Sequence, residues 1–207
     1  MKQILILGAG KSSSHLIQYL SQNAARLAIR LIVIDRNTSL VPKDIIELQD
    51  VDVLEIPKAD LSDFETHIKT SFLTVSMLPA FMHVDIAKLC LQYSSHLITP
   101  SYVSKEMASL DVDAKAKGLV FLNEMGLDPG IDHMSTMKIY DEICSDGGGL
   151  YSYKSFTGGL VAKKSDTNPW HYKFSWNPRN VIIAGQGGDT KYKENSQLKV
   201  LQYEQLF

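Results

Sequence analysis

A turn near residue 10 has the residue types needed to bind a phosphate group. Gly8 and Gly10 follow the apolar run 4–7, and Ser13 stands where a helical pattern begins. The first glycine permits a tight turn, and the second lets the backbone approach a pyrophosphate at the helix N-terminus. Ser13 replaces the third glycine of the dinucleotide fingerprint and is still small enough for close packing of helix on strand. The competing interpretation is an ordinary strand-to-helix turn that carries two glycines. We expect cofactor contacts from the turn residues Gly8, Gly10, Lys11, Ser12 and Ser13.

Two residues of opposite charge at the end of the second apolar run bear on which dinucleotide is bound. At the position of Asp35 an acidic residue accepts hydrogen bonds from the adenosine ribose hydroxyls, which favours NAD. Its neighbour Arg36 can stack on adenine or pair with a 2′-phosphate, which favours NADP. Alternatively, Asp35 caps the next turn and Arg36 is solvated. The sequence therefore predicts NADP or NAD and leaves the choice open.

Short apolar runs alternate with longer amphipathic stretches over the first 126 residues. The expected strands are residues 4–7, 31–34, 51–56, 73–77, 96–99 and 119–123. The expected helices, with apolar residues at three- and four-residue spacing, are 13–25, 44–49, 60–70, 80–93 and 104–116. Most of the strands are apolar throughout, which is typical of parallel strands buried on both faces. The alternation predicts an α/β fold, a Rossmann-like doubly wound parallel sheet with right-handed crossovers.

The pattern changes near Gly126 and predicts a second domain. One helix is expected over 131–145, three glycines follow, and from there the sequence is aromatic, polar and strand-like, with a possible hairpin at 191–206. We therefore divide the chain into a dinucleotide-binding domain, 1–126, and the start of a second, α+β domain, 127–207. The second domain is expected to be incomplete.

Three further segments carry candidate site residues. Residues 76–79 and 99–102 end the fourth and fifth strands, and ligands of an open parallel sheet lie beyond such ends. Pro79 also suits a first helical turn, and Tyr102 is either a hydroxyl donor or a packing residue. In the segment 168–180, two Trp, a Tyr and a Phe accompany Arg179, which can hold a carboxylate by a bidentate fork. A compact aromatic cluster with Arg179 in a solvated ion pair is the alternative.

The most unusual segment is 123–133, which follows the sixth strand and brings its carboxylates to the same edge of the sheet. Structurally, Asp128 is expected as a helix N-cap with Pro129 at the first helical position, and Asp132 adds charge near the positive end of the dipole. His133 is expected to pack or to hydrogen-bond locally. No second His or Cys lies at ligand spacing, so no metal site is predicted.

The overall composition excludes several classes of protein. The chain has 207 residues with a formal net charge of -2, and its 21 Lys and Arg leave no basic surplus for nucleic acid. The longest apolar runs are strand-sized, so no membrane span and no signal peptide are expected. Cys90 and Cys144 lie in helical patterns and are interpreted as buried thiols of a cytoplasmic protein.

Together these motifs resemble one family, the glutamate-forming saccharopine dehydrogenases, also called saccharopine reductases. The resemblance extends from Lys2 to about the end of the chain. It rests on GAG at 8–10, SMLP at 76–79 with His83, TPSYVS at 99–104, NEMGLDPGIDH at 123–133, GGL at 158–160, and YKFSW at 172–176 with Arg179. The first motif is common to many dehydrogenases, whereas TPSYVS, NEMGLDPGIDH and YKFSW are specific.

The resemblance implies roles for individual residues. Ser101 and Tyr102 are expected to contact saccharopine, Asp128 to lie where substrate and nicotinamide meet, and Arg179 to bind a substrate carboxylate. Asp128 and Tyr102 are the candidate catalytic bases, although the substrate amine and a bound water can suffice. Cofactor contacts are implied at Leu78, Pro79, Glu124, Gly126, Leu127, Asp128 and Ser175.

The implied reaction oxidises the secondary amine of saccharopine with NADP or NAD, giving glutamate and 2-aminoadipate 6-semialdehyde, or runs in reverse. Members of the family have a second domain that binds saccharopine and supports dimers, which implies that residues 127–207 begin such a domain and that the protein is a homodimer. They are usually about twice this length, and a further substrate-binding arginine lies beyond Phe207, so the chain is expected to be a fragment. Three alternatives remain: an imine-reducing synthase of the carboxynorspermidine or homospermidine type, a non-catalytic dinucleotide-binding module, and the lysine-forming saccharopine dehydrogenase.

Overall fold

The computed structural model describes residues 1–156, 161–174 and 188–205. The chain divides into two compact units, Met1–Ser155 and Phe156–Phe207, and each is described by itself. This division follows the density of contacts along the chain. It does not test the boundary expected between residues 126 and 127, which stays a prediction.

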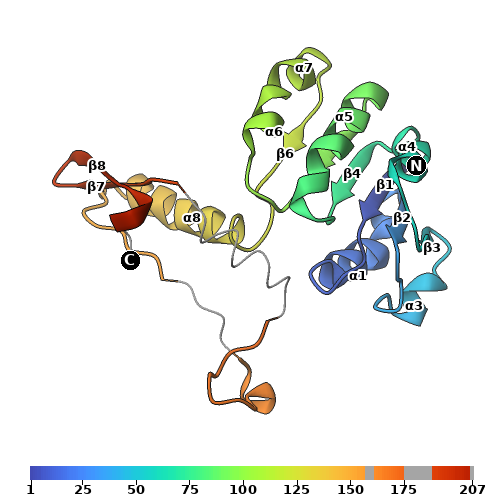
Figure 1. Ribbon diagram of the computed structural model, residues 1–207, viewed down its shortest axis with the longest axis horizontal. Helices are drawn as coiled ribbons and strands as arrows, with labels where there is room; N and C mark the ends of the chain where they lie inside the picture. Colours follow the sequence, from blue (N-terminus) through green and yellow to red (C-terminus); the bar gives the residue numbers. More distant parts are fainter. Residues whose placement is uncertain (157–160, 175–187, 206–207) are drawn as a thin grey trace. The chain divides into compact units, whose positions relative to one another are not determined.

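The first unit contains a six-stranded parallel sheet (Figure 1). The strands are β1 (Lys2–Leu7), β2 (Ile29–Asp35), β3 (Val51–Glu55), β4 (Leu73–Ser76), β5 (His96–Ile98) and β6 (Phe121–Leu122). Their order across the sheet is β3-β2-β1-β4-β5-β6, and each neighbouring pair is parallel. The strand order reverses between β1 and β4, which is where ligands of doubly wound sheets bind. The predicted Rossmann-like sheet is thereby confirmed.

Helices cover both faces of this sheet because successive side chains of a strand point to opposite faces. Ile4 and Ile6 of β1 belong to one apolar cluster, together with residues of α1 (Ser14–Gln22), α2 (Ala24–Leu27) and α3 (Lys43–Ile46). Leu5 and Leu7 belong to the other, which takes in α4 (Leu61–Ile68), α5 (His83–Tyr93) and α6 (Lys105–Ser109). Burying each such side chain contributes roughly 2 kcal/mol to folding.

Two of the expected helices are interrupted. The predicted helix 13–25 is divided into α1 and α2 at Asn23, whose side-chain amide donates to the Tyr19 carbonyl at 2.8 Å. The predicted helix 104–116 is divided at Leu110 into α6 and α7 (Asp111–Ala116). Side-chain caps nevertheless mark two of the predicted starts. Asp60 forms a reciprocal capping box with Asp63 at α4, and the Ser104 hydroxyl accepts from the Met107 N–H at α6.

After the sheet the chain forms one long helix, α8 (Ile131–Ser145), as predicted. In the second unit, β7 (Thr190–Glu194) and β8 (Gln197–Leu201) pair as an antiparallel hairpin, which confirms the hairpin expected there. Short 3-10 turns occur at η1 (Ala80–Met82), η2 (Lys163–Ser165) and η3 (Tyr203–Gln205). Within the described residues, no helix is long and apolar enough to cross a membrane.

The two cysteines differ in burial, which corrects one prediction. Cys90 on α5 is fully buried, as expected. Cys144 is exposed, so the prediction of a second buried thiol is wrong. The physical reason is that α8 has no buried residue, so its helical periodicity does not correspond to a face covered by other described residues.

Candidate active site

The glycine turn after β1 has the geometry that a dinucleotide phosphate requires. Gly8 has φ +106°, and a Cβ there would lie 3.0 Å from the Met77 carbonyl oxygen, so a larger residue would be strained. At Gly10 a Cβ would meet no atom within 4 Å. The space beside Gly10 is therefore open on the side where a pyrophosphate would approach the start of α1.

The serines of this turn differ in what they can contact. Ser13 is buried, and its hydroxyl donates to the Gly10 carbonyl at 2.9 Å. This favours the packing role expected for a small residue at the third glycine position over a phosphate contact. Lys11 and Ser12 are exposed, so both can reach a bound phosphate.

Asp35 at the end of β2 bonds to the backbone through both carboxylate oxygens. Oδ2 accepts from the Ala9 N–H at 2.5 Å, and Oδ1 accepts from the Asn37 N–H at 2.9 Å. Of the two interpretations left open by the sequence, the bond to Asn37 favours the structural one, in which Asp35 caps the next turn. The bond to Ala9 in addition ties the glycine turn to the end of β2. Both Asp35 and Arg36 line a cavity at this strand end.

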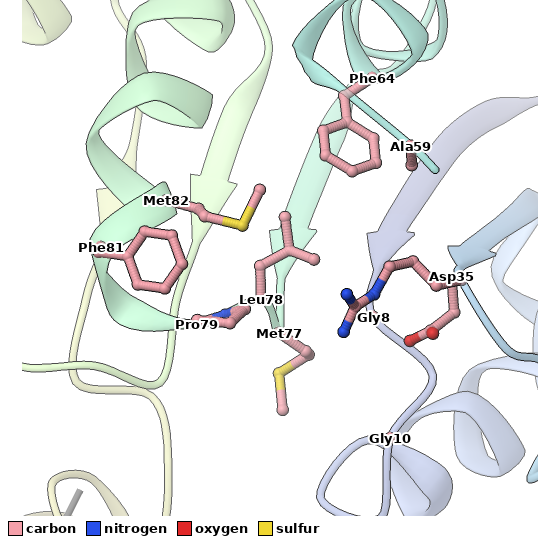
Figure 2. A pocket seen from close by; sticks show the side chains of 11 residues that line it. Gly8, Gly10, Asp35, Ala59, Phe64, Met77, Leu78, Pro79, Phe81 and Met82 are labelled. Carbon is pink, nitrogen blue, oxygen red and sulfur yellow. The ribbon is translucent and has the colours of Figure 1, made fainter. Parts of the chain in front are cut away.

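A cavity of about 320 Å³ lies at the carboxyl ends of β1, β2 and β4. Figure 2 shows Gly8 and Asp35 on one side of it and the apolar side chains of Leu78, Phe81 and Met82 on the other. The full lining is Gly8, Gly10, Asp35, Arg36, Ala59, Phe64, Met77, Leu78, Pro79, Phe81 and Met82. An apolar slot with one arginine and a glycine turn suits the adenosine part of a dinucleotide. Six of the predicted cofactor residues therefore line one cavity, namely Gly8, Gly10, Asp35, Arg36, Leu78 and Pro79.

Next to this cavity, a buried histidine connects two strand ends. His83 begins α5, and its Nδ1 lies 3.0 Å from the Ser76 hydroxyl at the end of β4. Its Nε2 lies 2.9 Å from the hydroxyl of Ser101, which follows β5. Burial lowers the pKa of His83 to about 4, because the charged imidazolium is poorly solvated there. His83 is therefore neutral near pH 7.

The depressed pKa of His83 predicts a pH-dependent stability. In the unfolded chain a histidine titrates near 6.5, so between pH 6.5 and 4 the unfolded state binds more protons than the folded state. The stabilisation is therefore complete above pH 6.5 and is lost as the pH falls toward 4, by roughly 3 kcal/mol in the free energy of unfolding. Urea unfolding at pH 7.5 and pH 4.5 should show this loss in the wild type and a smaller loss in His83→Gln. A variant of an exposed histidine, His15→Gln, should keep the wild-type loss. An equal loss in the wild type and in His83→Gln would contradict the prediction.

Tyr102 and Asp128 form the second polar contact at this edge of the sheet. The Tyr102 hydroxyl donates to Asp128 Oδ1 at 3.1 Å. Tyr102 is 65% exposed, which favours the hydroxyl donor over the packing residue. Partial burial and the neighbouring Asp128 carboxylate raise the pKa of Tyr102, so the phenol keeps its proton at neutral pH. The pair thus presents one hydroxyl donor and one carboxylate acceptor to solvent.

The loop 123–130 holds this pair in place through backbone contacts. The Glu124 N–H donates to the Ser101 carbonyl at 3.0 Å, and Glu124 Oε1 accepts from the Val103 N–H at 3.2 Å. A Cβ on Gly126 would lie 3.2 Å from Pro100, and one on Gly130 would lie 2.1 Å from the Gly126 carbonyl oxygen. The loop is therefore closed on itself and against the segment after β5.

This loop also corrects the expected helix start. Asp128 is not an N-cap, because α8 begins at Ile131 after Gly130. The Gly126 N–H donates to the Pro129 carbonyl at 2.9 Å and the Ile131 N–H donates to the Gly126 carbonyl at 3.0 Å, so the chain forms a local ring before the helix. The Asp128–Pro129 bond is cis. His133 makes the local contact expected of it, with Nδ1 2.8 Å from Asp132 Oδ1.

Two predicted residues, Ser175 and Arg179, lie outside the described residues. Ser101, Tyr102 and Asp128 lie in the segments that follow β5 and β6. The glycine turn and Arg36 follow β1 and β2. Leu127 is exposed on the loop beside Asp128. In the described parts of the chain, no group of three His, Cys, Asp or Glu side chains could hold a metal ion.

Comparison with known proteins decides which family this site belongs to. Residues 4–122 match the model described as the saccharopine dehydrogenase NADP binding domain, and residues 126–207 match the saccharopine dehydrogenase C-terminal domain. The chain belongs to the saccharopine dehydrogenase family.

Individual relatives agree with the family models. The chain is 33% identical over 198 residues to saccharopine dehydrogenase [NADP(+), L-glutamate-forming] of Schizosaccharomyces pombe, covering 96% of this chain and 43% of the relative. It is 40% identical over 164 residues to the alpha-aminoadipic semialdehyde synthase of Arabidopsis thaliana, covering 77% of this chain and 15% of that protein. The chain thus spans less than half the length of these curated relatives.

A solved structure of the family has the same fold. Apo saccharopine dehydrogenase (L-Glu forming) from Saccharomyces cerevisiae superposes with a TM-score of 0.76 at 29% identity, over 100% of this chain and 45% of that one. The resemblance seen in the sequence motifs is therefore confirmed, as is the NADP-binding domain within it. In the sequence, His83 is noted only as part of a motif, and its contact with Ser101 is not predicted. The one sequence feature that could have indicated this contact is the histidine at the start of the helix that follows Ser76.

Proposed function

We propose that this chain takes part in the NADP-dependent oxidation of saccharopine at its secondary amine, giving L-glutamate and 2-aminoadipate 6-semialdehyde, or in the reverse reaction. The observation that carries the proposal is the pair Tyr102–Asp128, which lies with Ser101 beyond the carboxyl end of β5 in a chain whose glycine turn and Arg36 fit NADP. The family membership supports the same reaction class.

The residues present fit the cofactor. Open space beside Gly10 accepts a pyrophosphate, with Lys11 and Ser12 exposed next to it. Arg36 lines the same cavity as Gly10, where its guanidinium can pair with a 2′-phosphate. Leu78 and Pro79 would cover the base side, and Glu124, Gly126, Leu127 and Asp128 would line the nicotinamide side. When bound, NADP supplies hydride acceptance and donation.

The proton chemistry falls to Asp128. In the oxidative direction, removal of a hydride from the carbon next to the nitrogen and of a proton from the nitrogen would give an imine. Asp128 accepts that proton, while Tyr102, whose pKa is raised, remains a donor to the carboxylate. Water then adds to the imine carbon, and cleavage of the carbon–nitrogen bond releases glutamate and the aldehyde.

The substrate carries three carboxylates, so the site must offer donors for them. Ser101 presents a half-buried hydroxyl beside Tyr102. Arg179 is the proposed bidentate partner of a carboxylate, and Ser175 the proposed further cofactor contact.

Arg36 is predicted to set the preference for NADP. Replacing Arg36 with Ala should weaken NADPH binding roughly tenfold or more, because a charge-assisted hydrogen bond to the 2′-phosphate is lost. NADH binding should change less than about threefold, since NADH has no 2′-phosphate to lose. Fluorescence titration of both reduced cofactors measures this. Lys2→Ala, a charge removed from the start of β1, serves as the control. Equal weakening for both cofactors would mean that Arg36 stacks on adenine instead.

The experiment that tests the proposed function is saccharopine-dependent reduction of NADP, followed at the absorbance of the reduced nicotinamide. The expected result is that saccharopine reduces NADP, and at a higher rate than it reduces NAD. The same assay with carboxynorspermidine and homospermidine tests the alternative imine-reducing synthases. NADPH binding without turnover of any amine would favour the non-catalytic dinucleotide-binding module and overturn the proposal for this chain.

Two further properties stay predictions. A homodimer is proposed because the second domain of the family is expected to support dimers, and sedimentation would test it. A cytoplasmic location is proposed from the composition and from the pair of unlinked cysteines.

A further inference from the structure

The contact between His83 and Ser101 joins a fully buried part of the fold to the candidate substrate site. Ser76 is buried at the end of β4, His83 is 3% exposed, and Ser101 is half-buried in the segment after β5. The three side chains form one continuous chain of hydrogen bonds, 3.0 Å from Ser76 Oγ to Nδ1 and 2.9 Å from Nε2 to Ser101 Oγ. The hydrogen bonds thus lead from the core to the half-buried hydroxyl of Ser101, the residue before Tyr102 of the candidate site.

Because His83 is neutral, the hydrogen bonds from Ser76 through His83 to Ser101 have a defined direction. With a pKa of about 4, the imidazole carries one proton near pH 7, so one ring nitrogen donates and the other accepts. If Nδ1 carries the proton, Ser101 must donate to Nε2, and only its oxygen lone pairs face the site. If Nε2 carries the proton, Ser101 accepts from the ring, and its own hydroxyl proton is free.

Ser76 decides between these two tautomers. Its hydroxyl is completely buried, and a buried hydroxyl proton needs an acceptor. Within the part of the chain that the structure describes, His83 Nδ1 is the side-chain partner of this hydroxyl. Ser76 therefore donates to Nδ1, and the ring proton is assigned to Nε2, where it is donated to Ser101 Oγ.

We propose that His83 is a positioning residue, which holds the Ser101 hydroxyl as a hydrogen-bond donor toward a carboxylate of the substrate. The inference rests on the proposed function, because saccharopine supplies the carboxylate. A hydroxyl that accepts one hydrogen bond becomes a better donor of another, so the bond from Nε2 strengthens the one to the substrate. The opposite tautomer would direct oxygen lone pairs at an anion and repel it.

The binding test uses two replacements of His83 that each retain one half of the ring. The amide nitrogen of Gln reaches the position of Nε2 and can still donate to Ser101, whereas Asn reaches only the position of Nδ1 and keeps the Ser76 contact alone. Saccharopine binding in the presence of NADPH is measured by calorimetry for His83→Gln, His83→Asn, Ser101→Ala and the double variant His83→Asn with Ser101→Ala. NADPH affinity and the thermal midpoint are recorded for each as controls of folding.

The proposal expects His83→Asn and Ser101→Ala each to weaken saccharopine binding roughly tenfold, with His83→Gln close to the wild type. In the double variant the loss should be no larger than in Ser101→Ala alone, because His83 acts through the hydroxyl that is already absent. Losses that multiply in the double variant would overturn the proposal, since they would mean that His83 affects binding through the general packing of α5. Unchanged binding in Ser101→Ala would overturn it as well.

A second measurement needs no saccharopine. It requires only the wild type and one folded variant, His83→Gln. The ¹⁵N shifts of the histidine rings distinguish the two neutral tautomers, and His83→Gln identifies the His83 signals. A protonated Nε2 and an acceptor Nδ1 support the proposal, whereas a protonated Nδ1 overturns it. If the wild type reduces no NADP and binds no saccharopine, the proposed function fails, and the tautomer still shows whether the hydrogen-bond direction was assigned correctly.

Discussion

Replacing Asp128 with Asn is expected to lower saccharopine-dependent reduction of NADP roughly 100-fold or more, the usual contribution of a positioned general base. The carboxamide has nearly the same shape, and its oxygen can still accept the hydrogen bond that Tyr102 donates at 3.1 Å. It cannot accept the proton of the substrate amine. The measurement is the steady-state rate at saturating NADP, with saccharopine varied to separate kcat from KM.

The controls for this prediction remove a hydrogen-bond donor or a surface charge and leave the Asp128 carboxylate in place. Tyr102→Phe should reduce kcat about tenfold or less, because it removes a donor to the carboxylate and leaves the carboxylate itself. Asp141→Asn takes a carboxylate from the exposed surface of α8 and should leave the rate unchanged. If Asp128→Asn keeps the wild-type kcat, the substrate amine and a bound water are handling the proton.

Replacing Gly10 with Ala is expected to weaken NADPH binding about 100-fold while leaving the free energy of unfolding within about 0.5 kcal/mol of the wild type. Apart from Gly10 and its two chain neighbours, no atom of the described residues lies within 4 Å of a Cβ built there, so the folded chain accommodates the methyl group. A bound pyrophosphate would approach the backbone from this open side and would meet that methyl group. Fluorescence titration with NADPH and urea unfolding give the two quantities separately.

Two other glycines serve as controls for Gly10. Gly8→Ala should lose both stability and NADPH affinity, because its φ of +106° and its Met77 contact oppose any side chain. Gly149→Ala places a methyl group in equally open space elsewhere in the chain and should change neither. Wild-type NADPH affinity in Gly10→Ala would mean that the pyrophosphate does not lie on this turn.

The fold could be predicted because its signals are local. The strands are apolar on both faces, as parallel strands under two layers of helices must be, and the two sets of β1 side chains indeed enter different clusters. The interruptions at Asn23 and Leu110 could not be predicted, because apolar spacing continues through both breaks. The spacing of apolar residues indicates which face of a helix is buried. It does not show where a helix is briefly interrupted.

The candidate site could be predicted less completely, because its contacts join residues distant in sequence. Strand ends correctly placed Ser101 and Tyr102 at one edge, but the bond from His83 to Ser101 depends on where α5 begins after the η1 turn. Asp35 had two plausible roles, and only the position of the Ala9 N–H, in a neighbouring strand's turn, separates them. For Asp128, the usual Asp-Pro start of a helix was outweighed by the ring that Gly126 closes with Pro129 and Ile131.

The central position of β1 has a consequence for the order in which the sheet assembles during translation. One edge of β1 pairs with β2, which follows soon after it, while the other edge pairs with β4 at residues 73–76. Until β4 has left the ribosome, the open edge of β1 presents unpaired N–H and C=O groups beside some of the most apolar side chains of the chain. A sheet of β1, β2 and β3 alone would therefore have one apolar edge without a partner strand. A chaperone that shields nascent strands is expected to engage this chain before residue 76 emerges and to release it afterwards.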